Sequence, residues 1–304
     1  DWDYALDFGY KRTGSSYDAS GDRIAPEPSQ GDLFDSDAYS IGGKLGYHID
    51  DNQYIQLSAN YYTADQDSEY ASDPSVAKLP AGSVPAKAIK GLKLADQNQN
   101  ESQVYNLTYK NKDFLGSNFD SQIYYRDFYT RFNPTDGRNQ ANRANTINQG
   151  YQENEVFGSR FTFNTPLHFL GDSSLVWGGD FIREQSEMPL DTFDPVIYDQ
   201  SGGLEFVKNG NLIYLPELTT QSVGVFAQLK HRFNDQWSAE VGARYEDSFA
   251  EVDDFIPLTQ ANNPNPYTVK GGKVKADEWL YNASVTFSLV EEHSIYASFS
   301  QGFQ

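Results

Sequence analysis

The sequence has no cysteine, one methionine and four histidines among its 304 residues. Without cysteine it has neither a disulfide framework nor a thiolate metal site. No stretch approaches the ~18 consecutive apolar residues of a membrane-spanning helix. Basic residues are also scarce, since 23 Lys and Arg face 43 Asp and Glu and give a net charge of -20. This balance excludes nucleic acid as an expected partner, because phosphates attract basic surfaces.

Aromatic side chains are abundant instead, with 21 Tyr and 20 Phe. They fall in segments whose apolar residues occupy every second position, as in 223–229, 237–245 and 279–289. Successive side chains of a strand point to opposite faces, so each segment predicts a strand with one apolar and one polar face. About eleven such strands and no helix are expected. Alternation alone also suits a soluble β-sandwich.

Two further features favour a membrane barrel over a sandwich. Trp237 and Tyr245 lie eight positions apart on one face, as do Trp279 and Phe287. At ~3.3 Å per residue and a ~40° tilt, this separation spans roughly 20 Å of membrane normal, as two aromatic girdles would.

The second feature is that short and long connections alternate. Short ones are expected at 50–53, 112–118, 167–173, 234–236 and 290–293, and long ones at 12–38, 64–101, 133–152, 184–219 and 247–277. Outer-membrane barrels have short periplasmic turns and long extracellular loops. All four histidines, His48, His168, His231 and His293, then fall at the short-turn end.

The expected fold is therefore all-β, an antiparallel transmembrane barrel. An open sheet of about eleven strands would leave unpaired backbone groups in hydrocarbon, and bacterial single-chain barrels close with an even number of strands. We expect residues 1–304 to be part of one barrel domain, the N-terminal half of the wall of a barrel of about 22 strands.

Several segments resemble TonB-dependent outer-membrane receptors. Residues 296–303 (YASFSQGF) and 241–246 (VGARYE) are similar to wall strands of that family. Residues 17–24 (YDASGDRI), 122–134 (QIYYRDFYTRFNP) and 252–255 (VDDF), together with the closing strand, are most similar to its ferric aerobactin, or citrate-hydroxamate, receptors.

The resemblance implies a 22-stranded barrel in the bacterial outer membrane, with an N-terminal plug inside. It implies capture of a ferric siderophore and import driven by the TonB complex pulling on the plug. Neither the plug nor the C-terminal strands are expected in this chain. Outer-membrane lipid and lipopolysaccharide are the expected surroundings. No cofactor is implied, because ferric iron arrives as part of the cargo.

Candidate ligand-binding residues lie high on the polar faces of the expected strands. Arg126 and Arg160 fall on adjacent strands, and the inward aromatics Tyr62, Tyr124 and Phe128 could pack against a chelate. The alternative role is contact with the plug, through its carboxylates for the arginines and its packing surface for the aromatics.

Two stretches of the expected loops, 74–95 and 137–152, contain cations but no carboxylate. The cations are Lys78, Lys87, Lys90, Lys93, Arg138 and Arg143. A local positive patch would concentrate an anionic ligand such as a ferric citrate-hydroxamate. The alternative is that the lysines only keep the loops soluble.

Other functions remain open at this stage. The same fold could serve haem, cobalamin or an oligosaccharide, although no histidine is expected at the outer end to ligate haem. A passive porin-like or adhesin barrel is a further alternative. An enzyme is not expected, because no nucleophile with a neighbouring histidine base is available in the outer half. No metal site is expected either.

Overall fold

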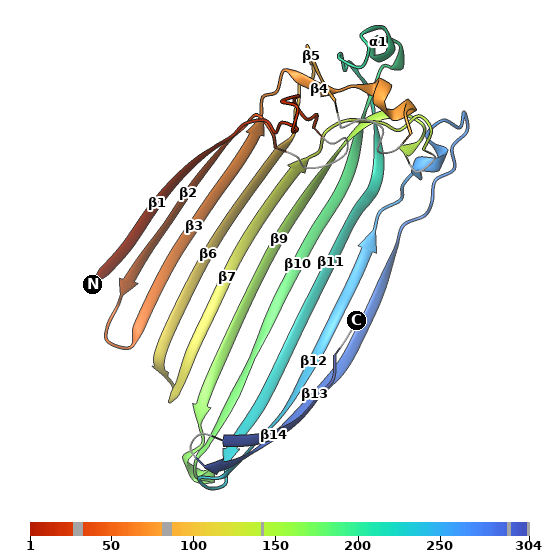
Figure 1. The fold of residues 1–304 in the computed structure, drawn as a ribbon. Helices are drawn as coiled ribbons and strands as arrows, with labels where there is room; N and C mark the ends of the chain where they lie inside the picture. Colours follow the sequence, from red (N-terminus) through yellow and green to blue (C-terminus); the bar gives the residue numbers. More distant parts are fainter. Residues whose placement is uncertain (27–32, 81–86, 141–142, 291–292, 303–304) are drawn as a thin grey trace.

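The computed structural model describes residues 1–26, 33–80, 87–140, 143–290 and 293–302, apart from the side chains of Ala77 and Lys78. Its main feature is one antiparallel sheet in which each strand pairs with the next along a path of eleven (Figure 1). In order these are β1 (Trp2–Thr13), β2 (Ser36–His48), β3 (Gln53–Gln66), β6 (Gln99–Phe114), β7 (Ser117–Arg131), β9 (Ile147–Pro166), β10 (Ser173–Phe193), β11 (Lys208–Arg232), β12 (Trp237–Val252), β13 (Gly272–Val290) and β14 (His293–Ser300).

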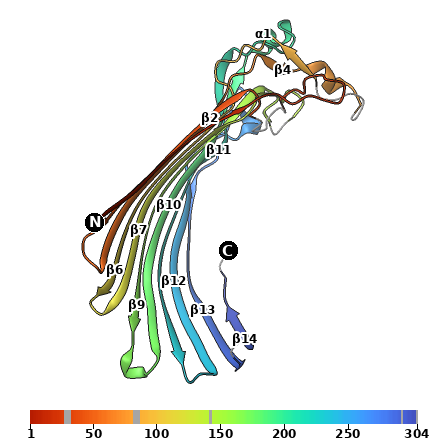
Figure 2. The same ribbon diagram turned by 60° about the vertical axis from the view of Figure 1, so that its left-hand side comes forward.

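The strands are joined in a strict up-and-down order, and the sheet curls along its width (Figure 2). The short β8 (Thr135–Asp136) pairs with β9, and β4 (Tyr70–Ser72) pairs with β5 (Ala88–Lys90) in a separate hairpin. The expected antiparallel strands and their number are confirmed.

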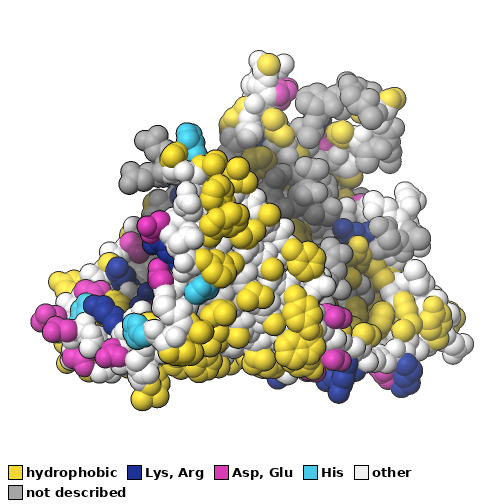
Figure 3. Space-filling view, turned by 90° about the horizontal axis from the view of Figure 1, so that it is seen from below, with side chains coloured by type: hydrophobic (Ala, Val, Ile, Leu, Met, Phe, Trp, Pro, Cys, Tyr) yellow, Lys and Arg dark blue, Asp and Glu magenta, His cyan; other side chains and the backbone are white. Residues whose placement is uncertain are grey.

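The strand register keeps the two kinds of face apart across the whole sheet. Trp177 lies opposite Phe163 on one side and Ala227 on the other, so apolar residues meet apolar residues. The apolar face is uncovered, with Val241 56% and Trp177 38% exposed. Figure 3 views the molecule from the short-turn end and shows a broad hydrophobic surface. Charged groups and histidines lie beside this surface. Since no second large sheet covers this face in the described part of the chain, the sandwich alternative fails.

Aromatic side chains gather at two levels of the apolar face. Near the short turns they are Trp2, Tyr47, Phe119, Phe163, Trp177, Trp237 and Phe287, with neighbouring ring centroids 4.2–4.6 Å apart. Further along the strands they are Tyr10, Tyr39, Tyr105, Tyr125, Phe157, Phe181, Tyr245 and Trp279, with separations of 5.2–6.5 Å. We call these the lower and upper girdles. Small and aliphatic side chains lie between them, as expected for a band that faces hydrocarbon.

The strands reach further past the upper girdle than expected. Residues 184–219 were expected to form a loop, but β10 continues to Phe193 and β11 begins at Lys208. Above the girdle the formerly apolar face becomes polar, so the alternation disappears from the sequence while the backbone pairing continues. The loop is therefore only 194–207.

The expectation of no helix is also corrected, though only in the connections. A six-residue helix, α1 (Pro195–Gln200), begins after Asp194, whose carboxylate accepts from the backbone N–H groups of Val196 and Ile197. Single 3₁₀ turns occur at Pro74–Lys78, His168–Leu170 and Leu258–Gln260. Among the described residues, no helix is both long and apolar enough to cross a membrane.

The buried hydrophobic cluster lies at the loop end of the sheet, where Ile147 of β9 and Phe193 of β10 meet the long connections. Ile147, Phe193 and Tyr198 are each at most 6% exposed, and Leu94 and Phe206 pack against them. These residues come from three different connections or their flanking strands. The sheet is a single layer. Its stability comes from the hydrogen bonds between strands and from the medium that covers its two faces.

Candidate functional site

The strand register places Tyr124 and Arg126 side by side on the polar face of β7. The guanidinium carbon of Arg126 is 5.7 Å from the centroid of the Tyr124 ring, which is within cation–π range. Tyr124 lies opposite Gly158 of β9, where an added Cβ would come 2.2 Å from the ring's Cζ atom. The ring therefore lies flat over Gly158, and only glycine leaves room for it.

Arg160 lies two residues along β9 from Gly158, so Arg126 and Arg160 are on adjacent strands of the polar face, four residues apart in the register. Its guanidinium is 5.6 Å from the ring centroid of Phe226. Asp180, directly opposite in the register, bonds instead to Arg244 at 2.7 and 2.8 Å. Among the described residues, no carboxylate lies within ion-pair distance of Arg126 or Arg160, and both side chains are exposed. Both of these cations thus remain uncompensated on this face.

Phe128 and Tyr62 lie higher on the same face. Both are opposite Ser102 of β6, which separates their strands, and they are 39% and 40% exposed. Two strand spacings put their backbones roughly 10 Å apart. The five expected ligand residues therefore share one face, with Tyr124 and Arg126 side by side, Arg160 nearer the short turns on the next strand, and Tyr62 at the far side.

The loop lysines are engaged in ion pairs. The pairs are Lys87–Asp73 at 3.5 Å, Lys90–Glu69 at 2.9 Å and Lys93–Glu205 at 2.9 Å. The side chain of Lys78 lies outside the described residues. Two partners, Asp73 and Glu69, come just before the carboxylate-free stretch, and the third comes from a distant loop. These lysines therefore attract an anion less strongly than the sequence suggested.

Arg138 also has acidic partners. It donates to Asp136 at 2.7 Å and to Asp199 of α1 at 2.8 Å, and its guanidinium lies 5.6 Å from the Tyr198 ring centroid. This hydrogen bonding holds the pKa of Asp136 below its usual range, and burial raises the pKa of Tyr198 to about 12. Arg143 differs, because it stacks 5.1 Å from the Tyr214 ring centroid and has no carboxylate partner among the described residues.

These contacts fasten separate loops to one another. Lys93 and Glu205 are 112 residues apart, and Asn262 donates to the backbone carbonyl of Ala144 across 118 residues. In the first loop, Asp35 accepts from Arg23, Ser15 and Ser68. The loops form one connected cap above the sheet.

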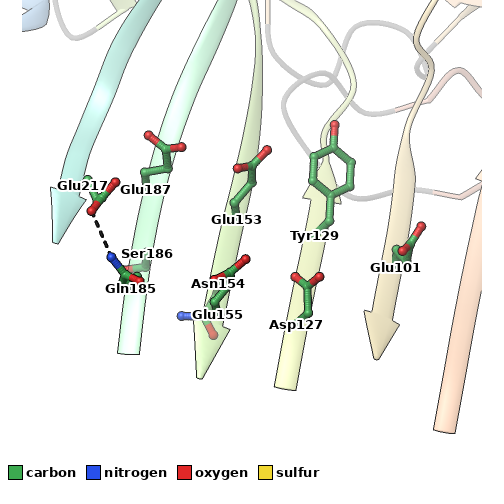
Figure 4. A pocket seen from close by; sticks show the side chains of 10 residues that line it. All are labelled: Glu101, Asp127, Tyr129, Glu153, Asn154, Glu155, Gln185, Ser186, Glu187 and Glu217. Carbon is green, nitrogen blue, oxygen red and sulfur yellow. Dashed lines mark hydrogen bonds between the residues drawn. The ribbon is translucent and has the colours of Figure 1, made fainter. Parts of the chain in front are cut away.

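A hollow of about 490 Å³ on the other side of the sheet was not foreseen. Figure 4 shows its lining, which is mainly acidic: Glu101, Asp127, Glu153, Glu155, Glu187 and Glu217, with Tyr129 and Gln185. By the register, Asp127 and Glu155 lie one step above Tyr125 and Phe157 of the upper girdle. Among the described residues, no three acidic or histidine groups are arranged to hold a metal ion. In the sequence, Glu153 and Glu155 are two residues apart and therefore lie on one face of a strand. This spacing could have predicted an acidic surface there.

A second hollow, of about 300 Å³, lies on the polar face beside the arginines. It spans β10 to β13, and its lining includes Ile182, Thr220, Ala250, Val274 and Ala276. Ile182 lies opposite Gly158, on which the Tyr124 ring rests. The hollow therefore begins one strand away from Gly158, next to the candidate site along the sheet.

Comparison with known families decides what these two faces are. The model described as "TonB dependent receptor-like, beta-barrel" matches residues 1–304, the whole chain. The chain belongs to this family. It is thus a barrel segment of the bacterial outer membrane and not an enzyme. The apolar face is the lipid-facing side of this receptor barrel, and the polar face with Arg126 lines its lumen.

Curated relatives cover the whole chain but are longer. It is 28% identical over 312 residues to the rhizobactin receptor of Rhizobium meliloti, covering 100% of the chain and 41% of that protein. It is 25% identical over 307 residues to the ferric aerobactin receptor of Klebsiella pneumoniae, covering 98% of the chain and 42% of that protein. The chain spans about two fifths of the length of these relatives.

Solved structures agree on the fold. The siderophore receptor PiuA from Acinetobacter baumannii matches with a TM-score of 0.62 and 16% identity, over 98% of this chain and 45% of that one. The ferric-catecholate import receptor Fiu from Escherichia coli K12 matches with a TM-score of 0.61 and 10% identity, over 98% and 50%. A copper transporter, OprC, matches at 0.62 and 11%, over 98% and 41%. At these identities the likeness shows the fold alone.

Proposed function

We propose that this chain forms part of the barrel wall of a receptor that imports an anionic ferric siderophore of the citrate-hydroxamate class. The observation that carries the proposal is the pair of lumen cations, Arg126 and Arg160, which lack carboxylate partners among the described residues of a chain with net charge -20. Unpaired cations on one face of a strongly acidic chain concentrate an anionic ligand by focusing the local field.

The ligand class is supported by the chemistry around these cations and by the relatives. Tyr124 offers an aromatic face and a hydroxyl next to Arg126, and Phe128 lies one step higher. Such a mixture binds a ligand that carries both charge and carbon surface. The names of the two relatives refer to rhizobactin and ferric aerobactin.

The remaining parts of the mechanism are proposed by analogy with the family. A plug inside the barrel would close the lumen and transmit the pull of the TonB complex, and residues 1–304 would supply the N-terminal half of the wall. Lipid and lipopolysaccharide would surround the girdles, with the acidic hollow at the level of the headgroups. Ferric iron enters only as cargo.

The test removes the lumen contacts from the receptor that carries this chain. Replacing Arg126 and Tyr124 together with alanine should raise the Kd for ferric aerobactin about tenfold or more, because a charge-assisted contact and an aromatic surface are lost. The control is Lys230→Gln, a lumen-facing cation near the short turns that is already paired with Glu240 at 3.2 Å. Unchanged affinity in the double variant would remove the proposal.

A further inference from the structure

An imidazole, that of His231 at the end of β11, lies on the lipid-facing side at the level of the lower girdle. Every second residue from Val223 to Leu229 faces lipid and is aliphatic, and His231 continues that series. It lies opposite Ala239 of β12, one step on the same face from Trp237 of the lower girdle. The imidazole therefore lies at the height where hydrocarbon ends and lipid headgroups begin.

Neighbouring side chains hold this ring in one orientation. Ser173, directly opposite on β10, donates its hydroxyl hydrogen to the backbone carbonyl of Leu170 at 2.8 Å. Its oxygen also lies 2.7 Å from His231 Nδ1. Because the hydroxyl hydrogen is already used, Nδ1–H is the donor in this second contact. Phe233 packs edge to face against the imidazole, with the ring centroids 4.4 Å apart. These contacts place the proton on Nδ1 and leave Nε2 for a partner outside the chain.

The Nε2 atom of His231 has no hydrogen-bond partner and no carboxylate within ion-pair distance in the part of the chain that the structure describes. His48 differs, because its Nε2 lies 3.7 Å from Asp3 on the lumen side. When an imidazole is protonated, both of its nitrogens donate, and the strongest acceptor for such a donor is an anionic oxygen. At the height of the headgroups, the phosphate of a phospholipid supplies that oxygen.

The surroundings of His231 fit a lipid better than a free anion. Phe233 and Trp237 are 62% and 43% exposed and border the lipid-facing surface. Among the described residues the indole N–H of Trp237 also has no acceptor, and the ester groups of a lipid supply one at this height. An occupant with phosphate at the imidazole and carbon over these rings is amphiphilic. Inorganic phosphate would leave the rings uncovered.

We propose that His231 binds the phosphate of an anionic phospholipid in the periplasmic leaflet, and that Ser173 positions its ring for this contact. The inference does not depend on the cargo, because it uses only the lipid-facing side of the wall. A charged hydrogen bond from β11 to a headgroup holds one lipid at the rim. It also sets the height of this part of the wall in the membrane.

The experiment uses the receptor that carries this chain, labelled with nitrogen-15 at histidine and reconstituted in phosphatidylglycerol vesicles at pH 5.5, where a free imidazole carries charge. Solid-state NMR measures the dipolar dephasing of the imidazole nitrogens by lipid phosphorus. The His231 signals are assigned by their absence from His231→Gln. A direct N–H···O contact places phosphorus about 4 Å from nitrogen, so the Nε2 signal of His231 should dephase strongly.

Ser173→Ala tests the positioning role. Without an acceptor for Nδ1–H the ring can rotate, and the dephasing of His231 should fall about twofold or more. Ser173→Thr keeps a hydroxyl group and should restore it. His48→Gln is the matched control, because it removes an imidazole at the same end of the sheet but on the lumen side. It should leave the His231 signal as it was.

Three results would count against the proposal. No dephasing of the His231 Nε2 signal in the unmodified receptor overturns it. Equal dephasing in amphipol with inorganic phosphate in place of the vesicles also overturns it, because the group would then take a free anion and not a lipid. Full dephasing in Ser173→Ala overturns the role given to Ser173.

Discussion

At several glycines of the lumen face, a neighbouring side chain occupies the space that a Cβ would take. Gly158 is the example that bears on binding. We expect Gly158→Ala to push the Tyr124 ring away, because the new Cβ would lie 2.2 Å from Cζ. These atoms are the outer end of a side chain on an open face, so the ring can move aside and the free energy of unfolding should fall by under about 1 kcal/mol. The displaced ring should also leave Arg126, so ferric aerobactin affinity should fall.

Urea unfolding in lipid vesicles and calorimetric titration measure the two effects. Gly43→Ala is the control, since the nearest atom to its added Cβ is 3.7 Å away and the position faces lipid. If both variants unfold and bind alike, Tyr124 does not depend on the space at Gly158.

At the scale of elements, the strands could be predicted from the sequence within the membrane. Their extensions beyond the upper girdle could not. Between the girdles one face is apolar, so residues such as 237–245 alternate visibly. Beyond the upper girdle both faces are polar, as Glu153 and Glu155 show on one face of β9 and Gln152 and Asn154 on the other. Backbone hydrogen bonds hold the strand there, and they leave no pattern in the side chains.

The same limit applies to the candidate site. Arg126 and Arg160 could be placed on one face of adjacent strands from the sequence, because they lie in two strongly alternating strands joined by one loop. The ion pairs of the loops could not be foreseen. Arg138 meets Asp199 across 61 residues, and only the folded loops bring them together.

The loop cap gives an element-scale prediction. We expect Arg138→Gln to loosen α1, because the bond to Asp199 joins that loop to the loop before β9. Arg138 is about one third exposed, so the contribution is about 1 kcal/mol, which corresponds to roughly fivefold faster amide exchange. Hydrogen exchange over residues 194–207 measures it.

Arg232→Gln is the matched control, because Arg232 pairs with Asp235 at 3.1 Å at the opposite, short-turn end. Its change should leave exchange in 194–207 as it was. Faster exchange throughout the sheet in Arg138→Gln would mean that the residue supports the barrel and not the cap.

The molecule as a whole is a sheet whose two faces meet different solvents. A water-soluble sheet would bury its apolar face against another layer, yet here Val241 and Trp279 are more than half exposed in the chain. Hydrocarbon is the medium in which that exposure is stable, because the lipid replaces the missing layer. The girdles mark the height of that medium on the wall.

This arrangement predicts opposite responses to the same charge on the two faces. Val241 lies on the lipid side between Trp237 and Tyr245, so Val241→Arg should cost about 2–4 kcal/mol of folding free energy in vesicles. Ser284→Arg makes an equal change at the same height on the lumen side, opposite Glu240. The new guanidinium can pair there and stay in water, so the cost should be under about 1 kcal/mol. Comparable losses in the two variants would show that the Val241 face does not meet hydrocarbon, and the assignment of the lumen residues would be lost with it.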